Sequence, residues 1–126
     1  MRRRGDGLMD TIIIGNQPLP ERRAAIARAW RTGEPEAAAR LDFESLDAAW
    51  RLLTAKRRAI LQAMAGQGPL SIREIARRVG RDVHPVHTDV RALHLSGVID
   101  RTEDGRMILP YAVIRFDFTF DTRQAA

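Results

Sequence analysis

The three histidines of the chain are the residues whose type and spacing most directly suggest a chemical role. His84, His87 and His94 all lie within residues 81–99, "RDVHPVHTDVRALHLSGVI". Three imidazoles in so short a stretch could form a metal site, an acid–base site or a surface that binds a polyanion. On a helix, His94 would lie about 15 Å along the axis from His84, because each residue rises about 1.5 Å. One helix therefore cannot bring all three imidazoles to one ion.

The remaining pair is too small for a stable metal site. His84 and His87 are three residues apart and could share one ion, but such a site needs three or four ligands. A metal sensor would need a second chain or an acidic tail to complete it. His94 suits the last turn of a helix, where a cation interacts favourably with the helix dipole. We expect no metal and no cofactor.

The sequence contains no recognisable motif for covalent or acid–base catalysis. The chain contains no cysteine, which excludes disulfides, thiolate zinc sites and cysteine nucleophiles. It also has no HExxH motif, no Ser/His/Asp arrangement and no glycine-rich phosphate loop. We expect no catalytic residues and no enzymatic activity.

Positive charge is concentrated in one central block of the 126 residues. The chain carries +5 overall, while residues 51–101 hold ten Arg or Lys against four Asp or Glu. Such a block is the electrostatic footprint of a nucleic-acid binder, although a solvated basic surface would look the same. No apolar run approaches the roughly 20 residues that span a bilayer. We expect a soluble protein of the cytoplasm, associated with the nucleoid.

The first half of the chain predicts one strand and three helices. A β-branched run at residues 10–15 predicts a strand, and residues 20–33 predict a helix that begins at a proline. Residues 32–42, around Pro35, are expected to be a linker or loop. Ser45 and Thr54 are predicted to cap the next two helices, the first with an inward stripe of Leu46, Ala49, Trp50 and Leu53, the second with Ile60, Leu61 and Met64 facing inward.

The central block predicts two short helices joined by a three-residue turn. Ser71 and Glu74 have the spacing of a capping box, and Gly80 has the place of a left-handed residue that ends a helix. Asp82 is positioned to cap the second helix, which Gly97 ends. Its spacing turns Val86, Val90 and Leu93 inward. These features predict a helix-turn-helix.

Two extended segments follow the second helix. The first contains Asp104-Gly105, a strong hairpin signal, and a hairpin at this place is typical of a winged helix. In the second, Ile114, Phe116, Phe118 and Phe120 alternate with polar residues and predict a half-buried strand. We expect this strand to join Thr11–Ile14 in one sheet whose apolar face is covered by Ile26 and Trp30.

Several motifs resemble a known class of regulators. The stretch "LTAKRRAILQAM…SIREIARRVGRDVHPVHTDVRALHLSGVI" resembles the winged helix-turn-helix of prokaryotic transcriptional regulators of the MarR/ArsR-like kind. With "FESL" included, residues 41–110 are similar to a family of small DNA-binding proteins of bacteria and haloarchaea. The resemblance implies an antitoxin-type regulator with a toxin partner. The sequence departs from the pattern at Pro85 and His94.

In such a motif the second helix enters the major groove of DNA. The residues expected to meet base edges are His84, Pro85, His87, Thr88 and Arg91. Those expected to bind phosphate are Lys56, Arg73, Arg77 and Arg81. Arg101 and Arg106 flank the tip of the expected wing. The apolar residues expected at a dimer or partner interface are Ile12, Ile14, Ile26, Trp30, Ile114, Phe116, Phe118 and Phe120.

Together these patterns predict an α+β fold, mainly α: a winged helix-turn-helix with additional N- and C-terminal strands in a small sheet. Residues 1–40 are expected to be a dimerisation or partner-binding arm, 41–110 the DNA-binding domain, and 111–126 a strand and tail. The predicted function is a homodimeric repressor that binds specific double-stranded DNA. The alternative is an antitoxin that neutralises a toxin protein through its terminal segments.

Overall fold

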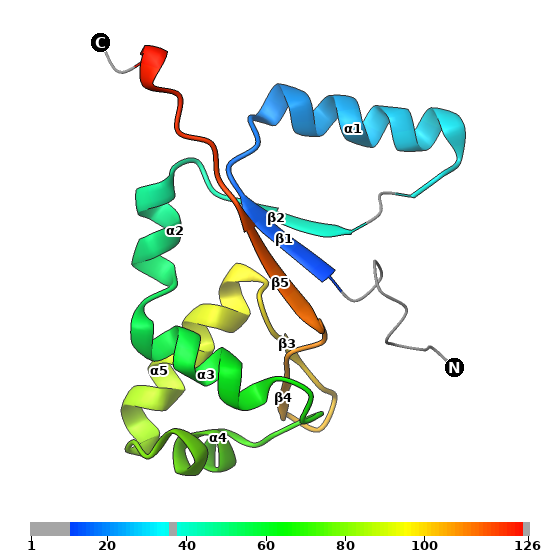
Figure 1. The fold of residues 1–126 in the computed structure, drawn as a ribbon. Coiled ribbons are helices and arrows are strands. Elements are labelled where there is room, and N and C mark those ends of the chain that lie inside the picture. The colour runs from blue at the N-terminus through cyan, green and yellow to red at the C-terminus, as the bar shows by residue number, and fades with distance from the viewer. Residues whose placement is uncertain (1–10, 36–37, 125–126) are drawn as a thin grey trace. The chain divides into compact units, whose positions relative to one another are not determined.

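The chain has an α+β fold made of two units. The structure is a computed structural model that describes residues 11–35 and 38–124. One unit combines residues of Met1–Ala48 and Val113–Ala126, and the other is continuous from Ala49 to Ala112. The order of elements is β1, α1, β2, α2, α3, α4, α5, β3, β4 and β5, followed by a short 3₁₀ turn (Figure 1). The sequence analysis predicted a continuous domain of residues 41–110, with residues 1–40 and 111–126 as separate segments.

The first unit is built on a parallel sheet of three strands. The strands are β1 (Thr11–Gly15), β2 (Ala39–Asp42) and β5 (Val113–Asp117). Their order is β2-β1-β5, and β1 pairs in parallel with both neighbours (Figure 1). Ile14 has Leu41 on one side and Phe116 on the other. The prediction that the first and last strands join one sheet is confirmed.

Composition explains why β1 is the central strand. Its three consecutive isoleucines are β-branched and favour extended backbone. Ile12 and Ile14 are buried, with 2% and 0% of their surface exposed. At Gly15, an added Cβ would lie only 2.5 Å from the backbone oxygen of Asp117. Glycine therefore allows β1 and β5 to run side by side to the end of their pairing.

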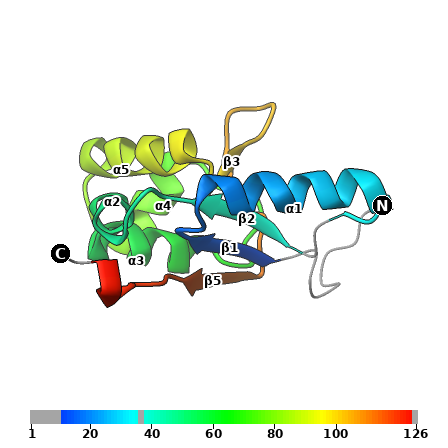
Figure 2. The ribbon, with the colours of Figure 1, turned by 90° about the horizontal axis from the view of Figure 1, so that it is seen from above.

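Helix α1 (Leu19–Thr32) does not cover the sheet as expected. It begins after Pro18 and ends at Gly33, whose φ of 76° is left-handed. The helix lies alongside the strands (Figure 2) but has no buried residue. Trp30 is 83% exposed and Ile26 45%, so the prediction that they cover the apolar face is wrong. A cavity of about 620 Å³ has Ile13 on the strand side and small residues of α1 on the other, including Ala25 and Ala29.

Strand β2 lies where a linker was expected. Ala39–Asp42 pairs with Ile12–Gly15, although "ARLD" contains no β-branched residue. Its last side chain anchors it: the Asp42 carboxylate accepts a hydrogen bond from the backbone of Gln17 at 2.9 Å and another from Arg40 at 2.8 Å. Burial opposes ionisation of Asp42, but these hydrogen bonds outweigh it and hold the pKa below its usual value.

The C-terminal strand is shorter than the sequence predicts. β5 ends at Asp117, so Phe118 and Phe120 lie beyond the sheet. The pairing partner β1 also ends there, at Gly15. The following segment is tied instead by Asn16, whose side chain donates to the carbonyl of Thr119 at 2.9 Å and accepts from its N–H at 3.0 Å. Phe120 is 78% exposed.

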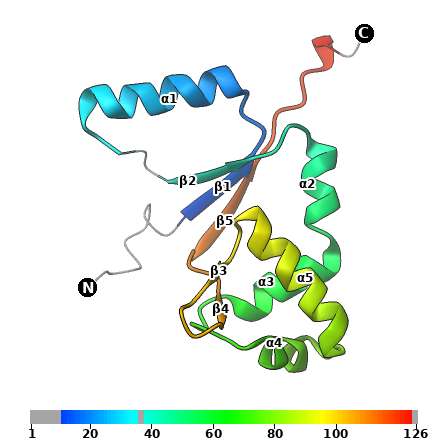
Figure 3. The same cartoon turned by 180° about the vertical axis from the view of Figure 1, so that it is seen from behind.

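The second unit contains a cluster of helices, three of which pack on one another (Figure 3). Helix α2 (Leu46–Leu52) leads into it, followed by α3 (Ala55–Met64), α4 (Ile72–Val79) and α5 (Val83–Ser96). The buried side chains of these three helices are Ile60, Leu61, Met64, Ile75, Ala76, Val86, Val90 and Leu93. The spacing had predicted inward faces for the six that lie on α3 and α5.

The helix boundaries follow the expected caps. Thr54 and Ser71 each accept a hydrogen bond from a backbone N–H three residues later. Ser45 does the same for α2. Gly80 and Gly97 end α4 and α5 with left-handed backbone. Asp82 stands at the cap position of α5, but its side chain makes no capping hydrogen bond.

The inward stripe expected on α2 is realised only in part. Ala49 and Leu53 are buried, whereas Trp50 is 46% exposed. Its ring is covered by a cation from the next helix, because the guanidinium of Arg58 lies 5.7 Å from the ring centre. This distance is within the range of a cation–π interaction.

A small antiparallel hairpin completes the second unit. β3 (Asp100–Arg101) pairs with β4 (Met107–Ile108). The loop contains Gly105 with φ 88°, as the sequence predicted at Asp104-Gly105. Met107 also exchanges two backbone hydrogen bonds of 2.8 Å with Leu70, just before α4. The hairpin is therefore joined directly to the segment that leads into α4.

Candidate nucleic-acid interface

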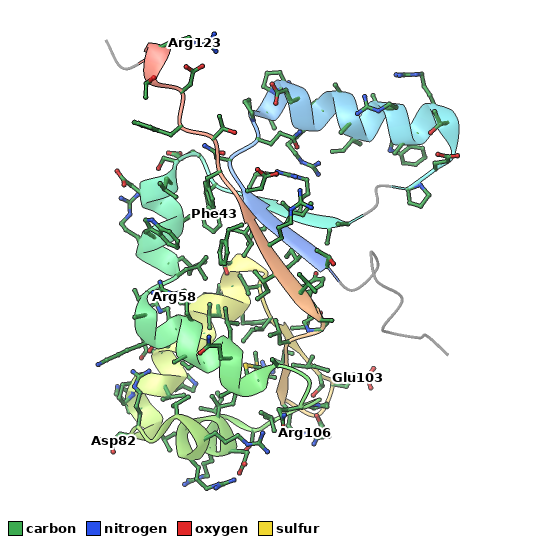
Figure 4. The ribbon with its side chains drawn as sticks, viewed as in Figure 1. Phe43, Arg58, Asp82, Glu103, Arg106 and Arg123 are labelled. Atoms are coloured by element: carbon green, nitrogen blue, oxygen red, sulfur yellow. The ribbon has the colours of Figure 1, made fainter. Side chains whose placement is uncertain are left out.

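Helix α5 presents one apolar face to the core and one polar face to solvent. Val86, Val90 and Leu93 are buried. The side chains expected to meet base edges are all exposed: His84, Pro85, His87, Thr88 and Arg91. Figure 4 marks the start of this helix at Asp82. The exposed surface is thus rich in hydrogen-bonding groups and carries one arginine in its middle.

The start of α5 is braced by a carboxylate between two arginines. Asp89 of α5 accepts a hydrogen bond from Arg57 of α3 at 2.9 Å and forms an ion pair with Arg81 of the turn at 2.9 Å. Burial opposes ionisation of Asp89, but the hydrogen bonds from Arg57 and Arg81 outweigh it, so the pKa lies below its usual value. Arg57 also donates to the carbonyl of Leu52 at 3.1 Å. One carboxylate therefore links α3, the turn and α5.

This brace changes the surroundings of Arg81, which had been assigned to phosphate binding. Its side chain is only 21% exposed. One terminal nitrogen binds Asp89, and the other is buried without a hydrogen-bond partner among the described residues. Arg81 consequently stabilises the turn through its ion pair with Asp89.

The basic residues of α4 share one acid. Glu74 accepts hydrogen bonds from Arg77 at 2.5 Å and from Arg78 at 2.7 Å. These bonds, that from Arg77 first, lower the pKa of Glu74 to about 2. Arg78 also donates to Gln67 at 2.6 Å. Arg77 keeps 71% of its side chain exposed and remains accessible to an anion.

Lys56 and Arg73, the other two residues expected to bind phosphate, are exposed. Lys56 lines a hollow of about 660 Å³ between the N-terminal ends of α3 and α5, together with His84 and Thr88. Arg73 lies on α4 and forms no ion pair in the part of the chain that the structure describes. The hollow thus places a lysine beside two of the residues expected to read bases.

A second, smaller cavity lies between α5 and the hairpin. It has a volume of about 160 Å³ and is lined by His87, Arg91 and His94 of α5 and by Arg101 of β3. The three α5 residues follow one another at spacings of four and three, which places them on one helical face. His94 had been assigned only to the helix end. The same spacing could have grouped it with Arg91.

The two hairpin arginines differ. Arg106 donates to Asp104 at 3.0 Å within the loop, where Figure 4 labels it. The hydrogen bond from Thr102 is the main cause that lowers the pKa of Asp104. Burial acts in the opposite direction but is the smaller effect. Arg101 has no such partner within residues 11–35 and 38–124.

The structure separates the three histidines into two places. His84 lines the larger hollow, while His87 and His94 line the smaller cavity. Among the described residues, no group of three or more His, Cys, Asp or Glu side chains is arranged to hold a metal ion.

The comparison with family models gives one match. The model named HVO_A0114 matches residues 52–116, slightly more than half of the chain. The chain belongs to the HVO_A0114 family. No curated protein and no solved structure matches it.

The HVO_A0114 match covers the hollow beside Lys56, the cavity between α5 and the hairpin, and the ion pairs of Asp89. It begins at the end of α2 and runs through α3, α4, α5 and the hairpin into β5. The described helices of this HVO_A0114 member include none with the length and apolar character needed to cross a membrane.

The residues expected at a dimer or partner interface of the HVO_A0114 chain all lie in the first unit. Ile12 and Ile14 are buried, and Ile114 and Phe118 are half-buried. The exposed members of the set are Ile26, Trp30, Phe116 and Phe120.

Proposed function

We propose that the protein is a sequence-specific double-stranded DNA-binding transcriptional regulator. In this proposal α4, the turn and α5 act as a helix-turn-helix, with β3 and β4 as the wing of a winged helix. One observation carries it. Helix α5 is fixed on its apolar side and at Asp89, yet its opposite face exposes five side chains that suit the edges of bases.

Charge supports the same conclusion. Residues 51–101 have six more basic than acidic residues, and the electrostatic part of DNA binding comes from neutralising phosphates. Lys56, Arg73 and Arg77 are the exposed cations beside α5 that we assign to phosphate. Arg81 is assigned to bracing the turn, because it is engaged with Asp89. Phosphate contacts of this kind set the position of the protein on the duplex.

Base discrimination is assigned to the exposed face of α5. Arg91 can bind guanine through two hydrogen bonds, a contact worth about 1–3 kcal/mol of discrimination. Thr88 can contact the thymine methyl group or a phosphate, and His84 and His87 can donate to base N7. Each of these side chains is exposed and carries a group that base edges recognise.

Two copies of the chain would bind a palindromic operator. Dimeric helix-turn-helix proteins place their recognition helices about 34 Å apart, one turn of DNA. A homodimer acting as a repressor of its own or a neighbouring operon suits a small DNA-binding chain in the nucleoid. No enzymatic activity and no cofactor form part of this proposal.

A second function is favoured by the exposed apolar residues of the first unit. Trp30 is 83% exposed and Phe120 78%, and exposed aromatic side chains are typical of binding surfaces. An antitoxin that blocks a toxin protein through this unit would use them. Trp30→Ser would then abolish capture of the toxin without changing DNA affinity. If Trp30 instead serves assembly of the homodimer, the same substitution would weaken the dimer and, with it, binding to the operator.

The DNA-binding proposal is tested by selecting a duplex from a random pool and measuring affinity by gel shift. Arg91→Ala should weaken the selected site by about 1–3 kcal/mol and relax one base position. Arg77→Ala should weaken all sequences alike. Arg23→Ala on α1 removes the same charge from the other unit and serves as the control. Equal effects of Arg91→Ala and Arg23→Ala would contradict the assignment of α5.

A further inference from the structure

The cavity between α5 and the hairpin stands apart because of its charges. All four of its ionisable lining residues are basic: His87, Arg91, His94 and Arg101. The remaining lining residues are Ile72, Val90, Gly105 and Met107. Neither α4 nor the hairpin therefore adds a carboxylate to its wall. The two arginines at this cavity therefore have no acidic side chain beside them in its wall.

Several arginines of the same unit are paired with acids: Arg57 and Arg81 with Asp89, Arg77 and Arg78 with Glu74, and Arg106 with Asp104. Arg51, Arg58, Arg73, Arg91 and Arg101 form no ion pair with a described residue. Of these five, Arg91 and Arg101 line one cavity, and they come from two different elements. Neither of them donates a side-chain hydrogen bond to a described residue.

We infer that this cavity is a binding site for a phosphate group, held by Arg101 and His94 with help from Arg91 and His87. Arginine and imidazole side chains supply the N–H donors that phosphate oxygens accept. The volume of about 160 Å³ equals a few water molecules at roughly 30 Å³ each. This volume is large enough for one tetrahedral anion.

The phosphate can come from the backbone of bound DNA or from a free ion in solution. In the first form the inference rests on the proposed function and extends it. The wing would bind a phosphate of the DNA strand beside α5 through Arg101, not through Arg106. His94 would act at the end of α5 farthest from the turn. Arg91 and His87 belong both to the face of α5 that we assign to base reading and to this cavity. His94 and Arg101 belong to the cavity alone, so they are the residues that distinguish the site.

The test uses the full chain with two probes, a selected DNA duplex and inorganic phosphate, each at pH 6.5. NMR signals of the imidazoles report occupancy, and fluorescence anisotropy reports DNA affinity. In the DNA form, the duplex shifts the His94 signal and Arg101→Gln weakens binding about fivefold to tenfold. Arg106→Gln is the matched control on the same hairpin and changes affinity less than twofold.

In the free-ion form, millimolar inorganic phosphate shifts His87 and His94 to saturation, and Arg101→Gln abolishes the shift. His84, which lies in the other hollow, does not respond. If neither probe shifts His94, the inference is overturned. If DNA binds tightly with Arg91-dependent specificity while His94 and Arg101 are silent, this inference fails and the proposed function stands. If only inorganic phosphate binds, the proposed function fails and the site stands.

Discussion

Arg81 and Asp89 form an ion pair in which a guanidinium nitrogen lies 2.9 Å from a carboxylate oxygen. Arg81 belongs to the turn before α5, and Asp89 lies two turns into that helix. The pair therefore fixes the direction in which α5 leaves the turn. Because Arg57 binds the other oxygen of Asp89, the loss of this single carboxylate would leave both arginines without their acid.

We expect Asp89→Asn to lower the free energy of unfolding by about 2 kcal/mol, since hydrogen bonds to charged groups and partly buried ion pairs have this magnitude. Urea unfolding measures the loss. Asp82→Asn is the control, because Asp82 makes no side-chain cap bond and asparagine is an equally good residue at that position. Equal losses in both variants would contradict the role of the brace.

Stability should fall as acid protonates Glu74. Hydrogen bonds from Arg77 and Arg78 lower its pKa from 4.5 to about 2 in the folded chain. The folded state therefore prefers the ionised form. The stabilisation that results is present above pH 4.5 and is lost as the pH falls through 2. Thermal unfolding followed between these pH values should show a smaller decline in Glu74→Gln than in the wild type. Parallel curves would show that the two arginines do not stabilise the folded chain through this acid.

The same substitution should strengthen DNA binding under the proposed function. Glu74→Gln releases Arg77 and Arg78 from their acid and removes a negative charge beside them. We expect affinity for any duplex to rise about threefold to tenfold at low salt, with a steeper salt dependence. Glu21→Gln on α1 makes the same change in net charge. A similar gain in both variants, measured by anisotropy, would assign the effect to net charge alone.

Two isoleucines of the first unit should differ sharply in their contribution to stability. Ile14 is fully buried, whereas Ile26 is 45% exposed. Ile14→Ala should cost about 2–5 kcal/mol, and Ile26→Ala less than about 1 kcal/mol. Denaturant unfolding at two protein concentrations measures both. A loss at Ile26 that grows with concentration would mean that α1 is covered by a second copy of the chain.

The elements of residues 49–112 could be predicted because their signals are local. Ser71, Gly80 and Gly97 each act within a few residues, and the spacing of Val86, Val90 and Leu93 fixes which side of α5 is buried. The hairpin at Asp104-Gly105 follows from the same kind of short-range preference. Such signals do not depend on the rest of the fold.

Other features depend on residues far apart in the sequence and were missed. The partner of Asp89 lies 32 residues away at Arg57, and no spacing rule connects them. β2 forms from "ARLD" because β1 offers it an edge, not because its residues favour a strand. The isoleucine and tryptophan of α1 were expected on the sheet, but the helix turns its alanines that way. The amphipathic pattern predicts a helix, but it does not determine which side of that helix faces the sheet.

The order of the strands has a consequence for synthesis on the ribosome. β1 lies between β2 and β5, yet β5 is made about 100 residues after it. Domains fold as they emerge, at about 5–20 residues per second. All of residues 49–112 leave the ribosome before β5 does, while the backbone groups on the edge of β1 that pairs with β5 are still unpaired. The nascent chain therefore carries an unfinished sheet for several seconds, and its closure by Val113–Asp117 is the last step of assembly.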